Sequence, residues 1–404
     1  MAMLSFLHQV WNGSVRPTSL IQAEATRRLL SLELSKLRDV EQAHTSSVNS
    51  IDIENIENRY LLSGGADGTI CIHELDNYSG TPQYTCKVIC KVSRRSRHAH
   101  KFSVESVQWY PFDTGLFTSG SMDCQLKVWD TNTLKPAEVF TMPGKIYSHS
   151  LSSVATHHSL IAVATSHSRV TLVDMRTGGC SHELRGHKSS VLSIQWSPVA
   201  ETLLATGSKD NRLLLWDIRS AKGHLCAFDQ HNGEAVAAGY SGKTAHDGTV
   251  SGLSFTQDGL FLVSCGTDDR VRLWDVALGR NSLVNFGKVV NDSCKTVKMA
   301  VTQSCDPPLV FVPSEGRVLV YSLVTGELFD TLIGHFNLVN CCALRQPHHE
   351  LYSGGNDRNI LIWIPDSDQE VCYEDYTRTA MKSKEATSKH TNNLRVDNWS
   401  SDED

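Results

Sequence analysis

The chain has 404 residues, of which 40% are hydrophobic and 20% charged, as in an ordinary soluble globular protein. Its formal net charge of −6 argues against a surface that coats nucleic acid, because such a surface is basic. No apolar run approaches the ~20 residues of a membrane-spanning helix, and the first residues do not form a secretory signal. The cysteines show no zinc-ligand spacing, so we predict reduced thiols in a nuclear or cytosolic protein, with no metal and no cofactor.

The first predicted element is a helix that begins at Thr18 or Ser19, both good N-cap residues, and ends near Ser35. Four apolar residues fall on one stripe of this helix, whereas Arg27 and Arg28 lie off it. The stripe consists of Ile21, Ala25, Leu29 and Leu32. Two interpretations stay open. The helix packs on the outside of the domain that follows, or it leaves that domain and inserts into a groove of a partner.

From residue 44 onward one pattern occurs five times. A histidine is followed by an aspartate 22 or 23 residues later, with a serine or threonine four residues before the aspartate and, in four copies, a tryptophan six residues after it. The copies are His44, Ser63, Asp67 with His73 in the tryptophan position; His100, Ser119, Asp123, Trp129; His187, Thr206, Asp210, Trp216; His246, Ser264, Asp268, Trp274; and His335, Ser353, Asp357, Trp363. The pattern resembles the WD40 repeat, a four-stranded propeller blade.

The intervals between tryptophans predict the number of blades. Trp129 and Trp216 are 87 residues apart and Trp274 and Trp363 are 89 apart, about twice the ~40–45 residues of one repeat. Each interval therefore hides a degenerate blade, with paired apolar strands at 160–165 and 169–174 and at 309–312 and 317–323. We predict an all-β, seven-bladed WD40 propeller over residues 36–365, an N-terminal helical segment over 1–35 and a disordered acidic tail over 366–404.

Two features outside the repeats also predict structure. The last copy ends at residue 365 without a fourth strand, so we expect residues 36–43 to supply it and close the ring. The first and third intervals between histidines are long, which predicts loops on the rim of the narrow face near 91–100 and 229–245. Arg94, Arg95, Arg97 and Lys101 make the first loop basic; we interpret it as solvated, with contact to nucleic acid or an acidic protein as the alternative.

The histidine, hydroxyl and aspartate of each copy are interpreted as structural. A nucleophilic site needs one exposed set beside an oxyanion hole, whereas this set occurs five times on one spacing. In WD40 blades the aspartate bonds the histidine, the histidine bonds the hydroxyl and the hydroxyl accepts the indole N–H. The sequence contains no phosphate-binding glycine loop, HExxH motif or nucleophile elbow, so no enzyme activity is predicted.

Two neighbouring blades end a strand with an aspartate and an arginine separated by one residue. These are Asp174 with Arg176 and Asp217 with Arg219. With the preceding helix, they resemble the WDxR boxes of substrate receptors of cullin-RING ubiquitin ligases, which dock the damage-specific DNA-binding protein adaptor. The resemblance implies an adaptor-binding set of Ile21, Ala25, Arg27, Arg28, Leu29, Leu32, Asp174, Arg176, Asp217 and Arg219. The alternative is that these arginines only cover the blade edges.

Longer segments resemble the Cockayne syndrome group A family. They are TRRLLSLELSK (26–36), ESVQWYPFDTGLFTSGSMDCQLKVWDTNTL (105–134), DQHNG (229–233), SLVNFGKV (282–289) and ELYSGGNDRNILIWIP (350–365). The resemblance implies a nuclear, non-catalytic substrate-recognition subunit of a cullin-4-type RING E3 ligase in transcription-coupled nucleotide excision repair. Its implied partners are the damage-specific DNA-binding protein adaptor, the Cockayne syndrome B translocase and RNA polymerase II, with no membrane and little or no direct DNA contact.

Two other functions are weighed against this one. A generic WD40 interaction scaffold predicts that binding survives deletion of residues 1–35. A direct nucleic-acid binder predicts a strong dependence on salt through the basic loop. The receptor hypothesis predicts that deletion of residues 1–35, or charge reversal at Arg176 and Arg219, strongly reduces adaptor capture and leaves the melting temperature unchanged.

Overall fold

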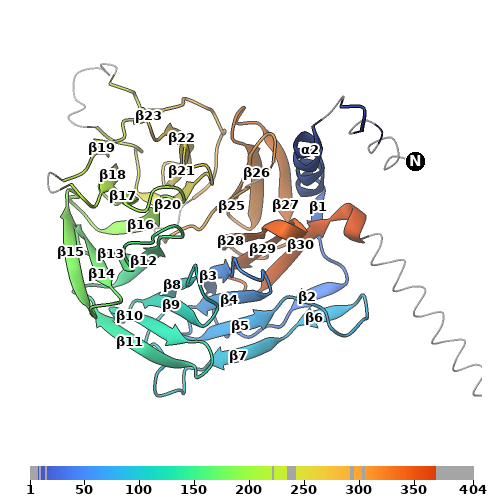
Figure 1. The fold of residues 1–404 in the computed structure, drawn as a ribbon, viewed down its shortest axis with the longest axis horizontal. Helices are drawn as coiled ribbons and strands as arrows, with labels where there is room; N and C mark the ends of the chain where they lie inside the picture. Colours follow the sequence, from blue (N-terminus) through green and yellow to red (C-terminus); the bar gives the residue numbers. More distant parts are fainter. Residues whose placement is uncertain are drawn as a thin grey trace, which may run out of the picture.

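Seven four-stranded antiparallel sheets stand around a central axis and form a ring (Figure 1). The computed structural model describes residues 8, 11–13, 16–220, 223–233, 243–291, 295–302 and 305–369. The prediction of an all-β, seven-bladed propeller is confirmed, including the two degenerate blades. We number the blades 1 to 7 in the chain order of their innermost strands.

Each blade runs from an innermost strand at the axis to an outermost strand at the rim. Strands that follow one another in a blade pair with each other, except that the outermost strand of blade 7, β1, comes from the beginning of the chain. Blades 1 to 4 are β3 (Val48–Ile53), β4 (Tyr60–Gly65), β5 (Ile70–Glu74), β7 (Val88–Val92); β8 (Val104–Trp109), β9 (Leu116–Ser121), β10 (Gln125–Asp130), β11 (Lys135–Thr141); β12 (Ile146–Leu151), β13 (Leu160–Thr165), β14 (Arg169–Asp174), β15 (Gly179–Arg185); and β16 (Val191–Trp196), β17 (Leu203–Ser208), β18 (Leu213–Asp217), β19 (Cys226–Ala227). Blades 5 to 7 are β20 (Val250–Phe255), β21 (Phe261–Gly266), β22 (Val271–Asp275), β23 (Arg280–Asn281); β24 (Ala300–Val301), β25 (Leu309–Ser314), β26 (Arg317–Ser322), β27 (Leu328–Ile333); and β28 (Val339–Arg345), β29 (Glu350–Gly355), β30 (Ile360–Pro365), β1 (Leu32–Leu34), with a 3₁₀ turn at Gln346–His348.

The hydrophobic core lies between neighbouring blades, because each blade has another sheet against both of its faces. The middle strands β13 and β25 are buried along their whole length, whereas the outermost strand β15 is almost entirely exposed. One cluster joins Val170 and Leu172 of blade 3 to Val191, Leu204 and Trp216 of blade 4. The continuous apolar runs of the degenerate blades therefore reflect burial on both faces of the sheet.

The strand that closes the ring lies earlier in the chain than the sequence indicated. Leu32 and Leu34 pair antiparallel with Pro365 and Trp363 of β30, so β1 is the outermost strand of blade 7. The prediction that residues 36–43 form this strand was wrong. Residues 38–40 instead form β2 (Arg38–Val40), which pairs in parallel with β6 (Tyr84–Cys86). Leu32, 3% exposed, decides the register because it packs in the same core cluster as Trp363.

The helix preceding this strand is shorter than predicted. Helix α2 (Pro17–Leu30) begins at a proline in the first turn, and the N-cap residue Arg16 makes no capping bond through its side chain. A start at Thr18 or Ser19 and an end near Ser35 were therefore wrong. Proline suits the first turn because its φ is helical and its missing N–H is not needed there. The helix ends at Leu30 because the chain turns at Ser31 to enter β1.

A helical turn at residues 366–369 fastens the edge of β1. The backbone N–H of Asp366 donates to the carbonyl of Ser31, and Asp368 pairs with Arg28. The side-chain amide of Gln369 accepts from Lys36 N–H at 2.9 Å and donates to the carbonyl of Leu34 at 3.1 Å. These four residues belong to the segment that was predicted to be disordered; the remainder of that segment, 370–404, lies outside the described residues.

A buried ionic network joins the last blade to the first. Arg345 of β28 pairs with Glu350 at 3.2 Å and with Asp76, and its Nε donates to the carbonyl of Asn58 at 2.7 Å. Arg38 of β2 reaches the other oxygen of Glu350 at 2.6 Å. Buried charges are tolerated when they are paired in this way, so the network ties β2, blade 7 and blade 1 together.

The strand order defines two faces of the ring. The narrow face, as we call it, carries the turns between second and third strands and the loops from each outermost strand to the next blade. The wide face carries the turns between first and second and between third and fourth strands. The loop predicted near 91–100 is on the narrow face, where residues 93–103 join β7 to β8. The preceding residues 75–87 join β5 to β7 on the wide face and contain β6. The other long loop, 228–249, is on the narrow face, and residues 234–242 of it lie outside the described residues.

Candidate functional site

The repeated polar residues form a buried hydrogen-bond chain in blades 2, 4, 5 and 7. Each hydroxyl oxygen lies 2.7 or 2.8 Å from the indole nitrogen and 2.7 or 2.8 Å from histidine Nε2. Histidine Nδ1 lies 2.8 to 3.2 Å from the aspartate. An indole N–H only donates, so the hydroxyl donates its own proton to Nε2 and Nδ1–H donates to the carboxylate. The chains are His100–Ser119–Asp123–Trp129, His187–Thr206–Asp210–Trp216, His246–Ser264–Asp268–Trp274 and His335–Ser353–Asp357–Trp363.

Blade 1 uses a variant of this chain. His44 Nε2 lies 2.8 Å from Ser63, but Nδ1 contacts Thr69 at 2.8 Å and is 3.5 Å from Asp67. Thr69 in turn donates to Asp67. His73, in the tryptophan position, is buried, and burial lowers its pKa to about 4. None of these imidazoles is open to a substrate, so the polar sets stabilise the blades.

Acidification below about pH 6.5 is expected to destabilise the propeller through these chains. Burial lowers the pKa of His100 and His246, so both are neutral in the fold. Burial alone would raise the pKa of Asp123, but hydrogen bonds from His100 and from backbone N–H groups outweigh it and lower the pKa to about 2. The unfolded chain binds more protons in both cases, so the stabilisation is complete above the unfolded pKa values, about 6.5 and 3.9, and is lost as the pH falls. Thermal melts from about pH 8 to pH 3 test this, and a melting temperature independent of pH would contradict it.

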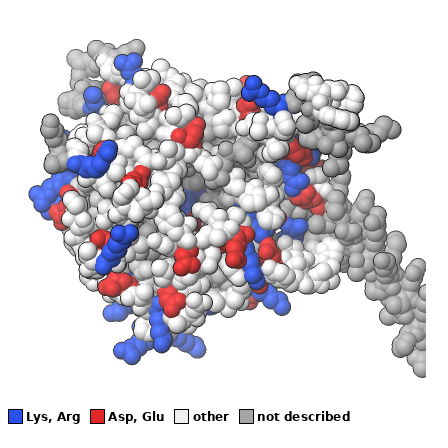
Figure 2. Space-filling model, viewed as in Figure 1, with Lys and Arg blue, Asp and Glu red and all other residues white. Residues whose placement is uncertain are grey.

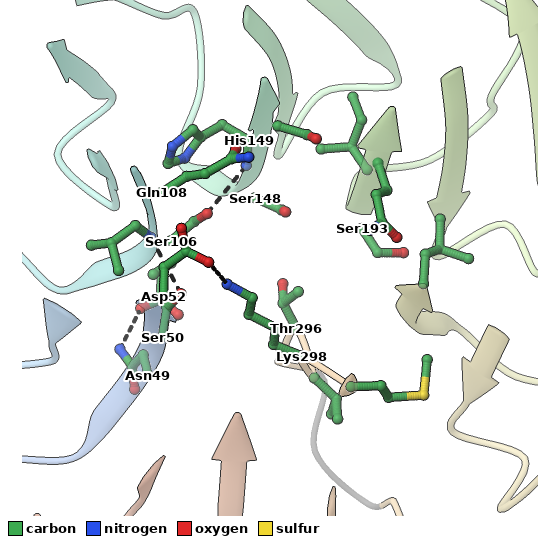
Figure 3. A pocket seen from close by; sticks show the side chains of 18 residues that line it. Asn49, Ser50, Asp52, Ser106, Gln108, Ser148, His149, Ser193, Thr296 and Lys298 are labelled. Carbon is green, nitrogen blue, oxygen red and sulfur yellow. Dashed lines mark hydrogen bonds and ion pairs between the residues drawn. The ribbon is translucent and has the colours of Figure 1, made fainter. Parts of the chain in front are cut away.

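The central channel is lined by polar side chains of the innermost strands (Figure 3). Residues 296–298 cross it. Thr296 Oγ1 donates to the carbonyl of Leu192 at 3.1 Å, and Lys298 Nζ lies 2.7 Å from both the carbonyl of Ile51 and Asp52 Oδ1. The cavity that remains has about 190 Å³. Other lining groups bond the next blade, as Asp52 does to Trp109 N–H at 2.9 Å, so the polar groups of the channel join blades.

The described residues contain neither a metal site nor a membrane span. Among them, no three His, Cys, Asp or Glu side chains gather in a way that could hold a metal ion. The described helices are all too short or too polar to cross a membrane.

The two Asp-x-Arg pairs lie on the wide face of adjacent blades, where β14 and β18 end. Arg219 is exposed and its guanidinium forks onto Asp217, with Nε and NH2 at 3.0 and 2.6 Å from the two oxygens. Hydrogen bonding to Arg219 lowers the pKa of Asp217. Arg176 is also exposed, and its backbone N–H donates to Asp174 at 2.9 Å. Both arginines are thus placed at the tips of wide-face turns.

Helix α2 lies on the wide face, because it leads into the first residue of the outermost strand β1, which is at that face. Only part of its predicted contact stripe is exposed. Ile21 is 62% exposed, whereas Ala25, Leu29 and Leu32 are at most 3% exposed and pack on the chain itself. The prediction that these three residues contact a partner was wrong, because they pack on the apolar edges of blades 6 and 7 instead. Arg27 is exposed beside Glu24, and Arg28 is turned toward Asp368.

The structure does not bring the helix and the Asp-x-Arg pairs together. Helix α2 lies beside β27 and β30, across the ring from β14 and β15 (Figure 1). The sequence analysis missed exposed apolar side chains on the wide-face turns of blades 4 to 6, between the two. With Ile21 they form what we call the wide-face arc: Val199, Leu225, Leu260, Leu278 and Val324. Each stands alone in a turn sequence, so only the fold shows that they share a face.

Neighbouring loops along this arc touch one another. Val199 lies against Gly259, and Cys226 Sγ approaches the carbonyl of Gly279 at 3.9 Å. The blade 6 turn packs on blade 5, and Thr26 of α2 accepts from Asp306 N–H of blade 6 at 3.0 Å. The arc is therefore continuous from blade 4 to the helix.

Comparisons with known proteins agree with the fold. The family model described as WD domain, G-beta repeat, matches residues 35–74, 91–130, 239–275 and 326–363. A second, the WD domain of leucine-rich repeat and WD repeat-containing protein 1, matches residues 121–232. The WD repeat-containing protein ATCSA-1 of Arabidopsis thaliana is 35% identical over 421 residues, which cover 87% of this chain and 93% of the relative. The chain belongs to the WD repeat family of ATCSA-1.

Other, less similar relatives share the repeat, but the match covers a smaller part of each relative. Histone acetyltransferase type B subunit 2 of Debaryomyces hansenii is 28% identical to this ATCSA-1 family member over 54% of the chain and 52% of the relative. Radiation-sensitive protein 28 of Saccharomyces cerevisiae is 24% identical over 65% of the chain and 56% of the relative. WD40 propellers are typically non-catalytic scaffolds for other proteins, which suits a fold whose polar clusters are used internally.

Proposed function

We propose that this ATCSA-1 family member is the substrate-recognition subunit of a cullin-4-type RING E3 ubiquitin ligase in transcription-coupled nucleotide excision repair in the nucleus. It would link the damage-specific DNA-binding protein adaptor to the Cockayne syndrome B translocase and stalled RNA polymerase II. The observation that carries the proposal is the 35% identity to ATCSA-1 over 87% of the chain. In this role the chain positions a substrate, and the ubiquitin-transfer chemistry belongs to the other subunits.

The wide face supports a docking role for this side of the ring. Exposed apolar side chains gathered on one face are typical of protein–protein contact, and arginine is enriched at the centre of such interfaces. The wide-face arc lies between the exposed Arg219 in blade 4 and helix α2, where it ends at Ile21. An adaptor that follows the arc would contact both parts of the site that the sequence predicted, even though they lie on opposite sides of the ring.

Substitutions on this face are expected to weaken adaptor capture strongly without changing stability. Ile21→Glu, Leu278→Glu and the double variant Arg176→Glu/Arg219→Glu each place a charge or a reversed charge on an exposed position of the wide face. Each should weaken capture of the purified adaptor by about tenfold or more, because a charge buried without a partner in an interface is costly. Binding is measured by surface capture and stability by thermal melting.

Phe336→Glu is the matched control for these variants. Phe336 is 93% exposed and lies on the narrow face, so the same chemical change there should leave adaptor capture at the level of the parent chain. Equal capture by the parent and all wide-face variants would rule out this docking face. Failure of the parent itself to capture the adaptor would rule out the ligase-receptor function.

A further inference from the structure

A group of lysines and arginines occupies the narrow face of blades 2 to 4. The narrow-face loops there are 93–103, 122–124, 142–145, 166–168, 186–190 and 209–212. Within these ranges the acidic residues are Asp123 and Asp210, whose side chains are 4% and 6% exposed and bonded to histidines. We call seven of the cations in these loops the basic arc: Arg94, Arg95, Arg97, Lys101, Lys145, Lys188 and Lys209. The eighth, Arg212, donates to the carbonyl of Gly186 at 3.2 Å. The arc is positive although the chain carries a net charge of −6.

Separate repeats hold these cations in equivalent places. Lys101 and Lys188 each follow the histidine of their blade, and their backbone N–H groups donate to Asp123 at 3.1 Å and Asp210 at 2.7 Å. Their side chains therefore start from fixed points directly above the buried polar chains. Because the backbone is already fixed at both lysines, binding a ligand there costs less conformational entropy.

Blade 3 joins the two anchored lysines into one surface. The backbone N–H of Lys145 donates to Ser166 Oγ at 3.2 Å, which places Lys145 on the narrow face between Lys101 and Lys188. Lys209 of blade 4 reaches toward blade 3, with Nζ 5.8 Å from the ring centroid of Tyr147. The cations of three consecutive blades thus face the same side of the molecule.

Intramolecular ion pairs do not account for the arc. In the part of the chain that the structure describes, no carboxylate lies within ion-pair distance of its seven side chains. Blade 5 differs, since Arg272 pairs with Asp268 and Lys288 with Asp269 on the same face. In Figure 2 basic side chains project together at the lower edge of the molecule, beside β7 and β11, whereas the rest of the drawn face mixes both signs. Uncompensated charge of one sign steers a ligand of the opposite sign.

We infer that the basic arc binds an acidic peptide segment of a partner protein. Carboxylates match the lysines and arginines, and Phe102, 62% exposed beside Lys101, adds an apolar contact that a peptide side chain would cover. A nucleic-acid backbone fits less well, because the chain as a whole is negative and would repel a long polyanion. The inference deepens and rests on the proposed function, since it gives the chemistry of the segment that the receptor would recognise.

The test measures binding of a short fluorescein-labelled peptide rich in glutamate, with one central phenylalanine, to the full chain by fluorescence anisotropy. Lys101→Glu/Lys188→Glu is expected to weaken binding by about tenfold or more, because it sets like charges opposite each other. Binding should also weaken as salt rises from low to physiological concentration. Arg270→Glu, an exposed cation on the narrow face of blade 5, is the matched control and should bind like the parent.

Three results would overturn the inference. They are equal binding by the parent and the double variant, loss of binding in Arg270→Glu to the same extent, or tighter binding of a single-stranded DNA of equal charge than of the peptide. Neutralising Asp402, Glu403 and Asp404 at the end of the chain gives a fourth arm. A tenfold gain in peptide affinity there would assign the arc to the chain's own tail instead of a partner. Adaptor capture uses the wide face, so it separates failure of this inference from failure of the proposed function.

Discussion

Replacing Trp216 by alanine is expected to lower the free energy of unfolding by about 3–5 kcal/mol, because the change leaves a cavity between blades 3 and 4. The indole is 1% exposed and packs in the core cluster that joins these blades. Its N–H also donates to Thr206 Oγ1 at 2.7 Å, so the substitution removes one of the bonds to that hydroxyl. Denaturant unfolding followed by circular dichroism measures the loss.

Asp210→Ala tests the other end of the same chain of bonds and should cost less, about 1–3 kcal/mol, because it leaves His187 without its acceptor but opens little space. Leu278→Ala, at an exposed turn, is the control and should change the free energy of unfolding by less than about 0.5 kcal/mol. If Trp216→Ala and Asp210→Ala both unfold like the parent, the buried chain does not hold the blade together.

Removal of residues 1–35 is expected to destabilise the propeller by several kcal/mol, not merely to release a docking element. The deletion takes away β1, which leaves β30 as an open edge, and it takes away Leu29 and Leu32, each buried in the core cluster of blades 6 and 7. Burying one such leucine contributes about 1.5–3 kcal/mol. The sequence alone predicted an unchanged melting temperature for this deletion, and the place of β1 in blade 7 and the burial of the two leucines contradict that prediction. Thermal melting of the truncated chain is the measurement.

Single substitutions on the helix stripe control for this deletion. Leu29→Ala should cost about 2–5 kcal/mol because its side chain is buried, whereas Ile21→Ala, on the same stripe but exposed, should cost less than about 0.5 kcal/mol. Equal and small effects at both positions would show that the helix does not pack on the ring. For the same reason, adaptor capture is tested with exposed point variants instead of the truncated chain.

Two predictions from the sequence were wrong for a related reason: the strand that closes the ring and the partner contact of the helix stripe. Residues 32–34 and 36–43 both offer a short stretch with apolar side chains, and a strand of three residues has almost no period to read. The choice between them depends on which leucine reaches the core of blades 6 and 7. The helix stripe has a similar ambiguity, because an apolar face fits a partner's groove as well as the chain's own blades. A local sequence pattern shows that a segment is apolar on one side, but it does not show which surface that side packs against.

The sequence by itself determined the number and order of the blades and the identity of the polar chains in four of them. It could do so because each blade repeats one local arrangement, in which residues at constant spacing meet across adjacent strands. Only the tertiary structure decided how the ring closes, which helix residues stay exposed, and that single apolar turn residues and single lysines from different blades collect on opposite faces. These features depend on contacts between residues far apart in the chain, and no local spacing encodes them.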